Sequence, residues 1–118
     1  GTTNLVKVQV AGHIIVTGKG LNGKKISGNL CVCHSNEDLK SFKDGDIIVA
    51  ADTTNEMMAQ MRQASALIVE AEGANCHAAI AGLSLDIPVL IAAKNALDVL
   101  KTSAYVEVDC ESGVVSAN

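Results

Sequence analysis

Aromatic residues are nearly absent from this chain, which has one Phe, one Tyr and no Trp among its 118 residues. Proteins that hold single-stranded nucleic acid stack its bases on aromatic side chains, and this composition offers almost none. The formal net charge of −4 also opposes binding to nucleic acid or to an anionic membrane surface. We therefore expect no nucleic acid and no membrane among the partners of this protein.

Long apolar runs are lacking too. No run reaches the roughly 18 residues that a membrane-spanning helix needs. The first residues do not have the basic and then apolar layout of a signal peptide. The four cysteines, Cys31, Cys33, Cys76 and Cys110, follow no disulfide framework spacing, and free thiols suit a reducing compartment. These features predict a cytoplasmic protein.

One short run, CVCH at residues 31–34, contains residue types that bind zinc. On a strand, Cys31 and Cys33 share one face at a spacing of about 6.6 Å, whereas His34 points to the other face. Tetrahedral zinc holds its sulfur ligands closer together than that, each at about 2.3 Å from the metal. We therefore expect no metal site in this chain.

Apolar residues make up 48% of the chain, enough to build the core of a single domain from aliphatic side chains. Alternating or continuous apolar runs predict strands at residues 5–10, 13–17, 26–33, 46–51, 66–69, 89–93, 104–108 and 114–116. The glycine-rich segment 18–25 predicts a solvated loop, because no helix follows it as one would follow a P-loop.

Short helices are predicted between the strands. Two capping boxes, Ser35 with Asp38 and Thr53 with Glu56, mark helix starts, and methionines after Thr53 supply an apolar face typical of a core helix. A third helix begins near His77, and a fourth covers residues 96–100. The pattern predicts an α/β fold with a mixed sheet and helices packed on it. A ligand would occupy the crevice at the carboxyl ends of the strands.

The candidate reactive residues lie in the stretch EAEGANCHAAIAGLSLDIP, residues 70–88. A glycine-bearing loop brings Cys76 and His77 to the first turn of a helix of small residues, which can pack closely on another element. Unpaired N–H groups and the positive end of the helix dipole favour a neutral imidazole there, and they also favour an anion. A neutral imidazole can act as a nucleophile. A purely structural histidine remains the alternative.

Three segments together resemble one family. GTTNLVKV, residues 1–8, is similar to the last strand of the C-terminal domain of pyruvate kinase. Residues 43–73 and 77–96 resemble the extra C-terminal domain of many bacterial pyruvate kinases, itself similar to the swivelling phosphohistidine domain of phosphoenolpyruvate-utilising enzymes. The resemblance implies a swivelling β/β/α sandwich over residues 11–118, preceded by a remnant strand and linker at residues 1–10.

The phosphohistidine motif of that family is matched only in part. The matching residues are Gly73, His77, Ala78, Ala79, Ile87 and Pro88. The departures are Glu72, Asn75, Cys76, Leu83 and Asp86, in place of glycine, threonine, serine, arginine and glycine. Leu83 removes a cation that would hold a phosphoryl oxygen, and Glu72 brings a like charge near. Leucine at this position resembles the pyruvate kinase branch.

The resemblance implies a parent enzyme that transfers phosphoryl from phosphoenolpyruvate to ADP in glycolysis, with magnesium and potassium. This domain itself is expected to hold no cofactor and to be non-catalytic, with a structural or regulatory role toward the rest of the parent chain and its homotetramer. Whether the isolated domain has any enzyme activity stays open.

Two alternatives assign chemistry to the helix start. In the first, His77 accepts a phosphoryl group as a phosphohistidine carrier. The residues expected to bind a small phosphorylated anion are Gly73, Asn75, Cys76, His77 and Ala78. In the second, Cys76 is a reactive thiol, because a helix start favours the thiolate. Successive helical residues point about 100° apart, which weakens a direct pairing of Cys76 with His77, and a buried, inert Cys76 is the simpler expectation.

Overall fold

The computed structural model describes residues 13–117. The predicted strand at residues 5–10 and the predicted domain boundary at residue 10 lie outside the described residues. The strands are β1 (His13–Thr17), β2 (Lys19–Leu21), β3 (Lys25–Val32), β4 (Ile47–Ala50), β5 (Ala66–Val69), β6 (Val89–Ile91), β7 (Tyr105–Asp109) and β8 (Val114–Ala117). The helices are η1 (Asn36–Ser41), η2 (Asn55–Met57), α2 (Met58–Met61), α3 (His77–Ser84) and α4 (Ala96–Val99), where η denotes a 3-10 helix.

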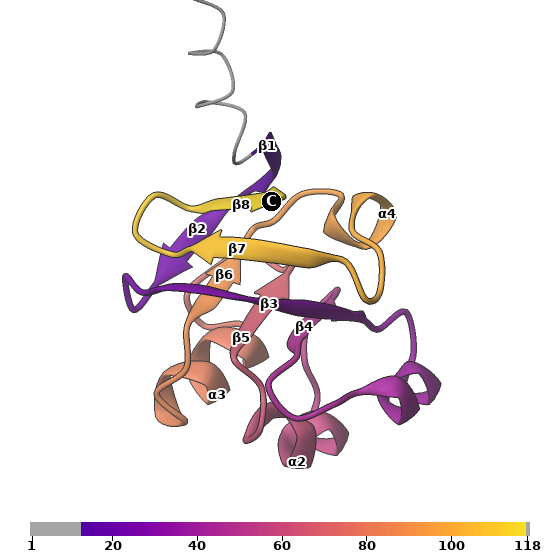
Figure 1. The fold of residues 1–118 in the computed structure, drawn as a ribbon. Coiled ribbons are helices and arrows are strands. Elements are labelled where there is room, and N and C mark those ends of the chain that lie inside the picture. Colours follow the sequence, from indigo (N-terminus) through magenta and orange to yellow (C-terminus); the bar gives the residue numbers. More distant parts are fainter. Residues whose placement is uncertain (1–12, 118) are drawn as a thin grey trace, which may run out of the picture.

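Within residues 13–117, the strands form one mixed eight-stranded sheet in the order β1-β8-β7-β3-β4-β5-β6-β2 (Figure 1). The long strand β3 belongs to both halves of the sheet. Its first part, Lys25–Asn29, pairs antiparallel with β7, and its last part, Leu30–Val32, pairs parallel with β4. The sheet is therefore antiparallel on one side of β3 and parallel from β3 through β6, with β2 antiparallel at the edge.

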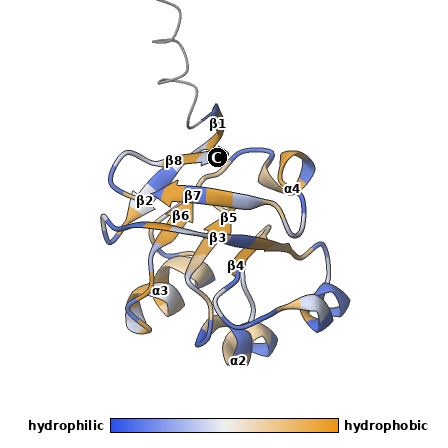
Figure 2. Ribbon diagram, in the orientation of Figure 1, coloured by the Kyte–Doolittle hydropathy of each residue, from blue (hydrophilic) through white to orange (hydrophobic). Residues whose placement is uncertain are grey.

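Two apolar cores lie on the two faces of the parallel strands. Successive residues of β4 alternate between them: Ile47 and Val49 pack toward β7 and β8, while Ile48 and Ala50 pack toward η2, α2 and α3. All four of these side chains are buried, which explains why β4 is a continuous apolar run (Figure 2). The antiparallel half of the sheet packs on one face of the parallel half and η2, α2 and α3 pack on the other, so the predicted α/β fold of β/β/α layers with a mixed sheet is confirmed.

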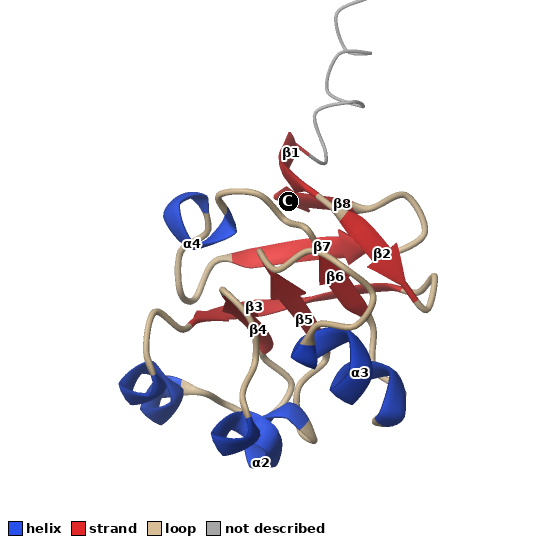
Figure 3. Ribbon diagram, turned by 180° about the vertical axis from the view of Figure 1, so that it is seen from behind, coloured by secondary structure: helices blue, strands red, loops and turns tan. Residues whose placement is uncertain are grey.

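Helices α2 and α3 cover the same face of the parallel strands (Figure 3). Met57 and Met61 are buried in that core, as the prediction of a core helix requires. Helix α3 packs through alanines and Gly82, where an added Cβ would overlap Cγ2 of Val89 in β6. None of the described helices is long and apolar enough to cross a membrane.

Two local predictions are wrong. The segment 18–25 contains strand β2, which pairs with β6, and a Cβ on Gly20 would overlap the Cys110 backbone, so close packing explains the glycine. The capping boxes do not form: neither Ser35 nor Thr54, which cap η1 and η2, makes a side-chain capping hydrogen bond. Asp38 instead accepts from the N–H of His34 (2.8 Å), and Thr53 precedes the cap of η2 and bonds elsewhere.

Candidate functional site

The start of α3 lies where the sequence places it. Cys76 is the N-cap residue, in an extended conformation, and His77 is the first helical residue. Gly73 has φ of +96°, a left-handed conformation that favours glycine, and its carbonyl accepts from the Cys76 N–H at 3.2 Å. This loop follows the carboxyl end of β5, so the helix start faces the segment that follows the adjacent parallel strand β4.

The side chain of Asp52, from the segment after β4, caps the first turn of α3. Its Oδ2 accepts from the His77 N–H at 3.1 Å, and its Oδ1 accepts from the Ala78 N–H at 2.9 Å. Oδ1 also accepts from the N–H of Thr53 at 2.8 Å. A carboxylate at a helix N-terminus satisfies unpaired donors and interacts favourably with the helix dipole. The chain thus supplies its own anion at the helix start.

The His77 ring is held by both of its nitrogens. Nδ1 lies 2.7 Å from Oγ1 of Thr53, which is buried, and Nε2 lies 3.0 Å from Oδ1 of Asn55. Because the Asn55 carbonyl oxygen only accepts, Nε2 donates to it, whereas the Thr53 hydroxyl can either donate to Nδ1 or accept from it.

The remaining residues of the expected anion site surround this cluster. Gly73 and Asn75 are exposed, Cys76 is partly buried against the core beneath the helices, and Ala78 is fully buried. The sequence analysis missed Asp52, Thr53 and Asn55 as functional partners of His77. Their position in the sequence could have indicated them, because all three follow closely on the buried run 46–51. The carboxyl end of that run neighbours the carboxyl end of residues 66–69 in a parallel sheet.

The outer face of α3 is apolar where a cation was expected from the family motif. Leu83 is 46% exposed and Ile80, one turn before it, is 60% exposed. Glu72 is also exposed, beside Gly73. The two family departures that bear on phosphoryl binding, Glu72 and Leu83, are therefore both solvent-facing positions in this structure.

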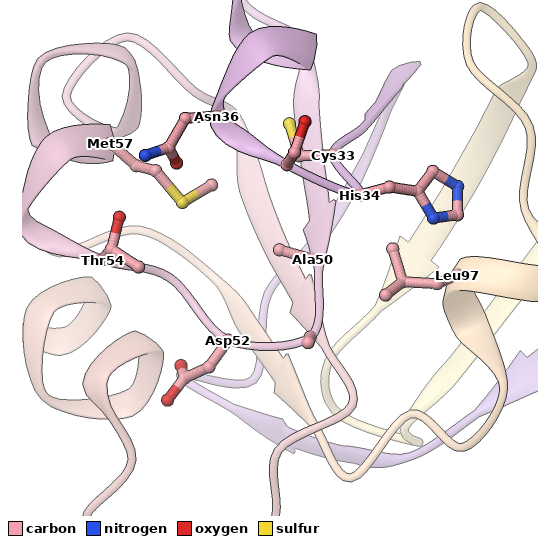
Figure 4. Close-up of a pocket in the computed structure, with 10 residues that line it drawn as sticks. Cys33, His34, Asn36, Ala50, Asp52, Thr54, Met57 and Leu97 are labelled. Carbon is pink, nitrogen blue, oxygen red and sulfur yellow. The ribbon is translucent and has the colours of Figure 1, made fainter.

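A small pocket lies beside this cluster at the carboxyl ends of β3 and β4 (Figure 4). Its volume is about 210 Å³. Asp52 lines it on one side and His34 and Leu97 on another. The expected position of a ligand crevice, at the strand carboxyl ends, coincides with this cavity.

Cys31, in β3, and Cys33, directly after it, have their sulfur atoms closer together than the strand spacing predicted. Sγ of Cys31 and Sγ of Cys33 are 3.8 Å apart. Burial, together with the neighbouring Cys31, raises the pKa of the Cys33 thiol to about 12. Residues 13–117 contain no cluster of three or more His, Cys, Asp or Glu that would hold a metal ion.

Two other cysteines differ in environment. Burial raises the pKa of the Cys110 thiol to about 11, and its Sγ lies 3.5 Å from the carbonyl oxygen of Val89. Cys76 is the one cysteine that is not fully buried within the described chain, so the expectation of a buried Cys76 is wrong. All four are free thiols.

Comparison with known proteins identifies the family. The family model for the PEP-utilising enzyme, mobile domain, matches residues 42–113. A pyruvate kinase of Bacillus licheniformis is 40% identical over 98% of this chain, and a probable phosphoenolpyruvate synthase of Archaeoglobus fulgidus is 34% identical over 93%. The chain spans 20% of the first relative and 15% of the second, so it corresponds to a small part of each.

The fold also recurs in solved structures. The holo-form of aconitase X from Thermococcus kodakaraensis aligns with a TM-score of 0.63 over 86% of this chain and 95% of that one, at 21% identity. At this identity the likeness concerns the fold alone. The family match covers more than half of the chain and the similarity to bacterial pyruvate kinases covers nearly all of it. This chain therefore belongs to the mobile domain family of PEP-utilising enzymes, and it is homologous to the C-terminal region of bacterial pyruvate kinases.

Proposed function

We propose that this chain is the extra C-terminal domain of a cytoplasmic pyruvate kinase and acts in that enzyme as a non-catalytic structural or regulatory unit. Identity of 40% over nearly the whole chain, against one fifth of the relative's length, supports this assignment. The parent would transfer phosphoryl from phosphoenolpyruvate to ADP with magnesium and potassium, and would assemble as a homotetramer. Residues 1–10 would end the preceding domain, and no cofactor would bind to residues 11–118.

The observation that carries the non-catalytic role is the position of Asp52. Its carboxylate accepts from the N–H groups of His77 and Ala78, which are the donors that a phosphoryl group at the helix start would need. A phosphoryl group of about −2 charge would meet this carboxylate at the same donors. Both ring nitrogens of His77 also have partners within the chain. The hydrogen bonds of Asp52, Thr53 and Asn55 therefore serve to hold the start of α3 against the segment after β4.

Deletion of the domain from the full-length enzyme tests this role. Turnover, response to effectors and subunit assembly would be measured for the full-length enzyme and for a chain ending before residue 11. We expect phosphoryl transfer to persist, with a changed effector response or a weaker tetramer. If all three properties were unchanged, the structural or regulatory role would be refuted. If transfer from phosphoenolpyruvate to ADP were lost in a folded, tetrameric deletion variant, the non-catalytic assignment would be refuted.

A phosphohistidine carrier is the second candidate, and the orientation of the His77 ring supports it. Thr53 fixes Nδ1, which leaves Nε2 on the side of the exposed residue Asn55. For Nε2 to attack phosphorus, the ring would carry its hydrogen on Nδ1, which would donate to the Thr53 oxygen, and Asn55 would move away. The Nε2–P bond would form as the P–O bond of phosphoenolpyruvate breaks.

Mass measurement separates the two candidates. The full-length enzyme would be incubated with phosphoenolpyruvate or ATP, and its intact mass would be compared with that of the full-length variants His77→Ala and, as the matched control, His34→Ala. A carrier predicts a phosphate-sized, acid-labile increment that disappears only in His77→Ala. No increment in the wild-type chain, or one that survives His77→Ala, would exclude the carrier.

A further inference from the structure

The pocket beside Asp52 has an apolar floor and two opposing walls. Ala50 at the end of β4 lies at its base, with Met57 and Thr54 to one side and His34 and Leu97 to the other (Figure 4). Its volume of about 210 Å³ is below the roughly 300 Å³ at which pockets for drug-sized ligands begin. A ligand that fills it is therefore the size of a single small ring system.

Polar groups stand at the rim of this floor. Ser35 and Thr54 are the cap residues of η1 and η2, and neither side chain makes a capping hydrogen bond. His34 and Asn36 are exposed residues at the same rim. Hydroxyl, amide and neutral imidazole groups can each donate and accept a hydrogen bond. The rim therefore suits a ligand whose edge alternates between donors and acceptors.

Charge decides between a neutral and an anionic ligand. No Lys or Arg is among the described residues that line this pocket, whereas Asp52 does line it. The Asp52 oxygens already accept three backbone N–H groups. An anion in the pocket would face this carboxylate without a compensating cation, so a phosphorylated ligand is disfavoured.

We propose that this pocket binds a neutral, planar heteroaromatic ring of nucleobase size. The two faces of such a ring are apolar, as are Ala50, Met57 and Leu97, and a thioether makes favourable contacts with aromatic rings. Its edge carries alternating donors and acceptors, which the amide of Asn36 can satisfy in pairs. The proposal goes beyond the function proposed above, because it rests on the pocket and not on the identity of the parent enzyme.

Occupancy of the pocket is coupled to the helix start through the segment after β4. Asp52 and Thr54 line the pocket, while Asp52 and Thr53 hold the backbone and ring of His77. A ligand that restrains this segment therefore also restrains the start of α3. The coupling predicts that a ring bound in the pocket changes the environment of His77 and Ala78, which do not line it.

Titration of the chain with adenine, followed by amide resonances in two-dimensional NMR at pH 7, tests the proposal. Adenine is neutral and planar at this pH. We expect saturable shifts at the backbone amides of Asn36 and Thr54, with a Kd in the millimolar range, and smaller shifts at His77 and Ala78. Inorganic phosphate at the same concentrations is expected to shift none of these amides.

Matched variants make the result specific. Ala51 is exposed and lines the pocket, so Ala51→Leu fills it and is expected to abolish the adenine shifts, whereas Ala59→Leu, at an exposed position of α2 outside the pocket, keeps them. Asn36→Ala is expected to weaken binding about fivefold to tenfold through lost hydrogen bonds.

Three results would overturn the binding proposal, and a fourth would refute the coupling to α3. The absence of saturable adenine shifts in the wild-type chain would refute the site itself. Equal adenine affinity in Ala51→Leu, Asn36→Ala and wild type would place binding elsewhere. Shifts of the same amides by phosphate would replace the neutral ring with an anion. Shifts confined to Asn36 and Thr54 would refute the coupling to α3. None of these results depends on the deletion experiment in the parent enzyme.

Discussion

Replacing Asp52 is the most direct test of how α3 is held. Asp52→Ala removes the acceptor for the N–H groups of Thr53, His77 and Ala78. Loss of a helix cap costs about 0.5–2 kcal/mol, and loss of a negative charge at a helix start adds about 0.3–1 kcal/mol. The third N–H, on buried Thr53, loses its partner as well. We expect the free energy of unfolding to fall by about 2–3 kcal/mol.

Urea unfolding of the chain at pH 7 measures this change, with two comparison variants. Asp52→Asn keeps Oδ1, which accepts from Thr53 and Ala78, and loses the charge, so its expected cost is about 1 kcal/mol. Asp44→Ala removes a negative charge from an exposed turn and is expected to change stability by less than about 0.5 kcal/mol. If Asp52→Ala cost no more than Asp44→Ala at the same m-value, the assigned role of this carboxylate would be wrong.

A second assay on Asp52→Ala tests whether the N–H groups that lose their acceptor can bind an anion. In Asp52→Ala the N–H groups of His77 and Ala78 have no acceptor, so they become available to an anion. We expect inorganic phosphate to raise the urea midpoint of Asp52→Ala, relative to chloride at equal ionic strength, more than it raises that of wild type or Asp44→Ala. Equal effects of phosphate on all three chains would show that the helix start does not select anions.

The remaining predictions concern packing and the thiols. Gly82→Ala is expected to cost about 1–3 kcal/mol of unfolding free energy in urea, because its Cβ overlaps Val89; wild-type stability would refute this contact. Iodoacetamide at pH 8 is expected to label the folded chain only at Cys76, so mass spectrometry of Cys76→Ser should show no label. The raised pKa values of Cys33 (about 12) and Cys110 (about 11), against 9.0 for an ordinary thiol, mean that above pH 9 the unfolded chain loses these protons first. The contribution of these thiols to the free energy of unfolding is fully present below pH 9 and is expected to fall by about 1 kcal/mol per thiol per pH unit above it. The fall should be shallower in Cys110→Ala. An equal slope in Cys110→Ala and wild type would show that Cys110 does not contribute to this pH dependence.

Much of the fold was predictable because burial repeats along the strands. Residues 46–51 and 66–69 are continuous apolar runs, and β4 and β5 are buried on both faces. The helix start at His77 was predictable from local features, since Gly73 and the small residues after His77 specify a turn and a closely packed helix. These features act within a few residues of one another, which is the range over which sequence patterns are informative.

The errors come from contacts between distant segments. Strand β2 forms because it pairs with β6, about 70 residues later, and no local pattern in a lysine- and glycine-rich segment reports that pairing. Thr53 and Glu56 have the spacing of a capping box, but the Thr53 hydroxyl bonds to His77 instead. A tertiary partner 24 residues away replaces the local one. Both cases show long-range pairing overriding a local preference.

Contacts between distant segments also determine the position of α3. Helix α3 is fixed at its N-terminus by Asp52, along its length by the close approach of Gly82 to Val89, and at its end by Asp86, whose φ of +60° turns the chain toward β6. Each of these contacts is made within the chain and needs no ligand. A helix start that resembles an anion site can therefore persist when its donors serve only to join α3 to the segment after β4. The bonds of the His77 ring to Thr53 and Asn55 add a further link between α3 and the segment after β4.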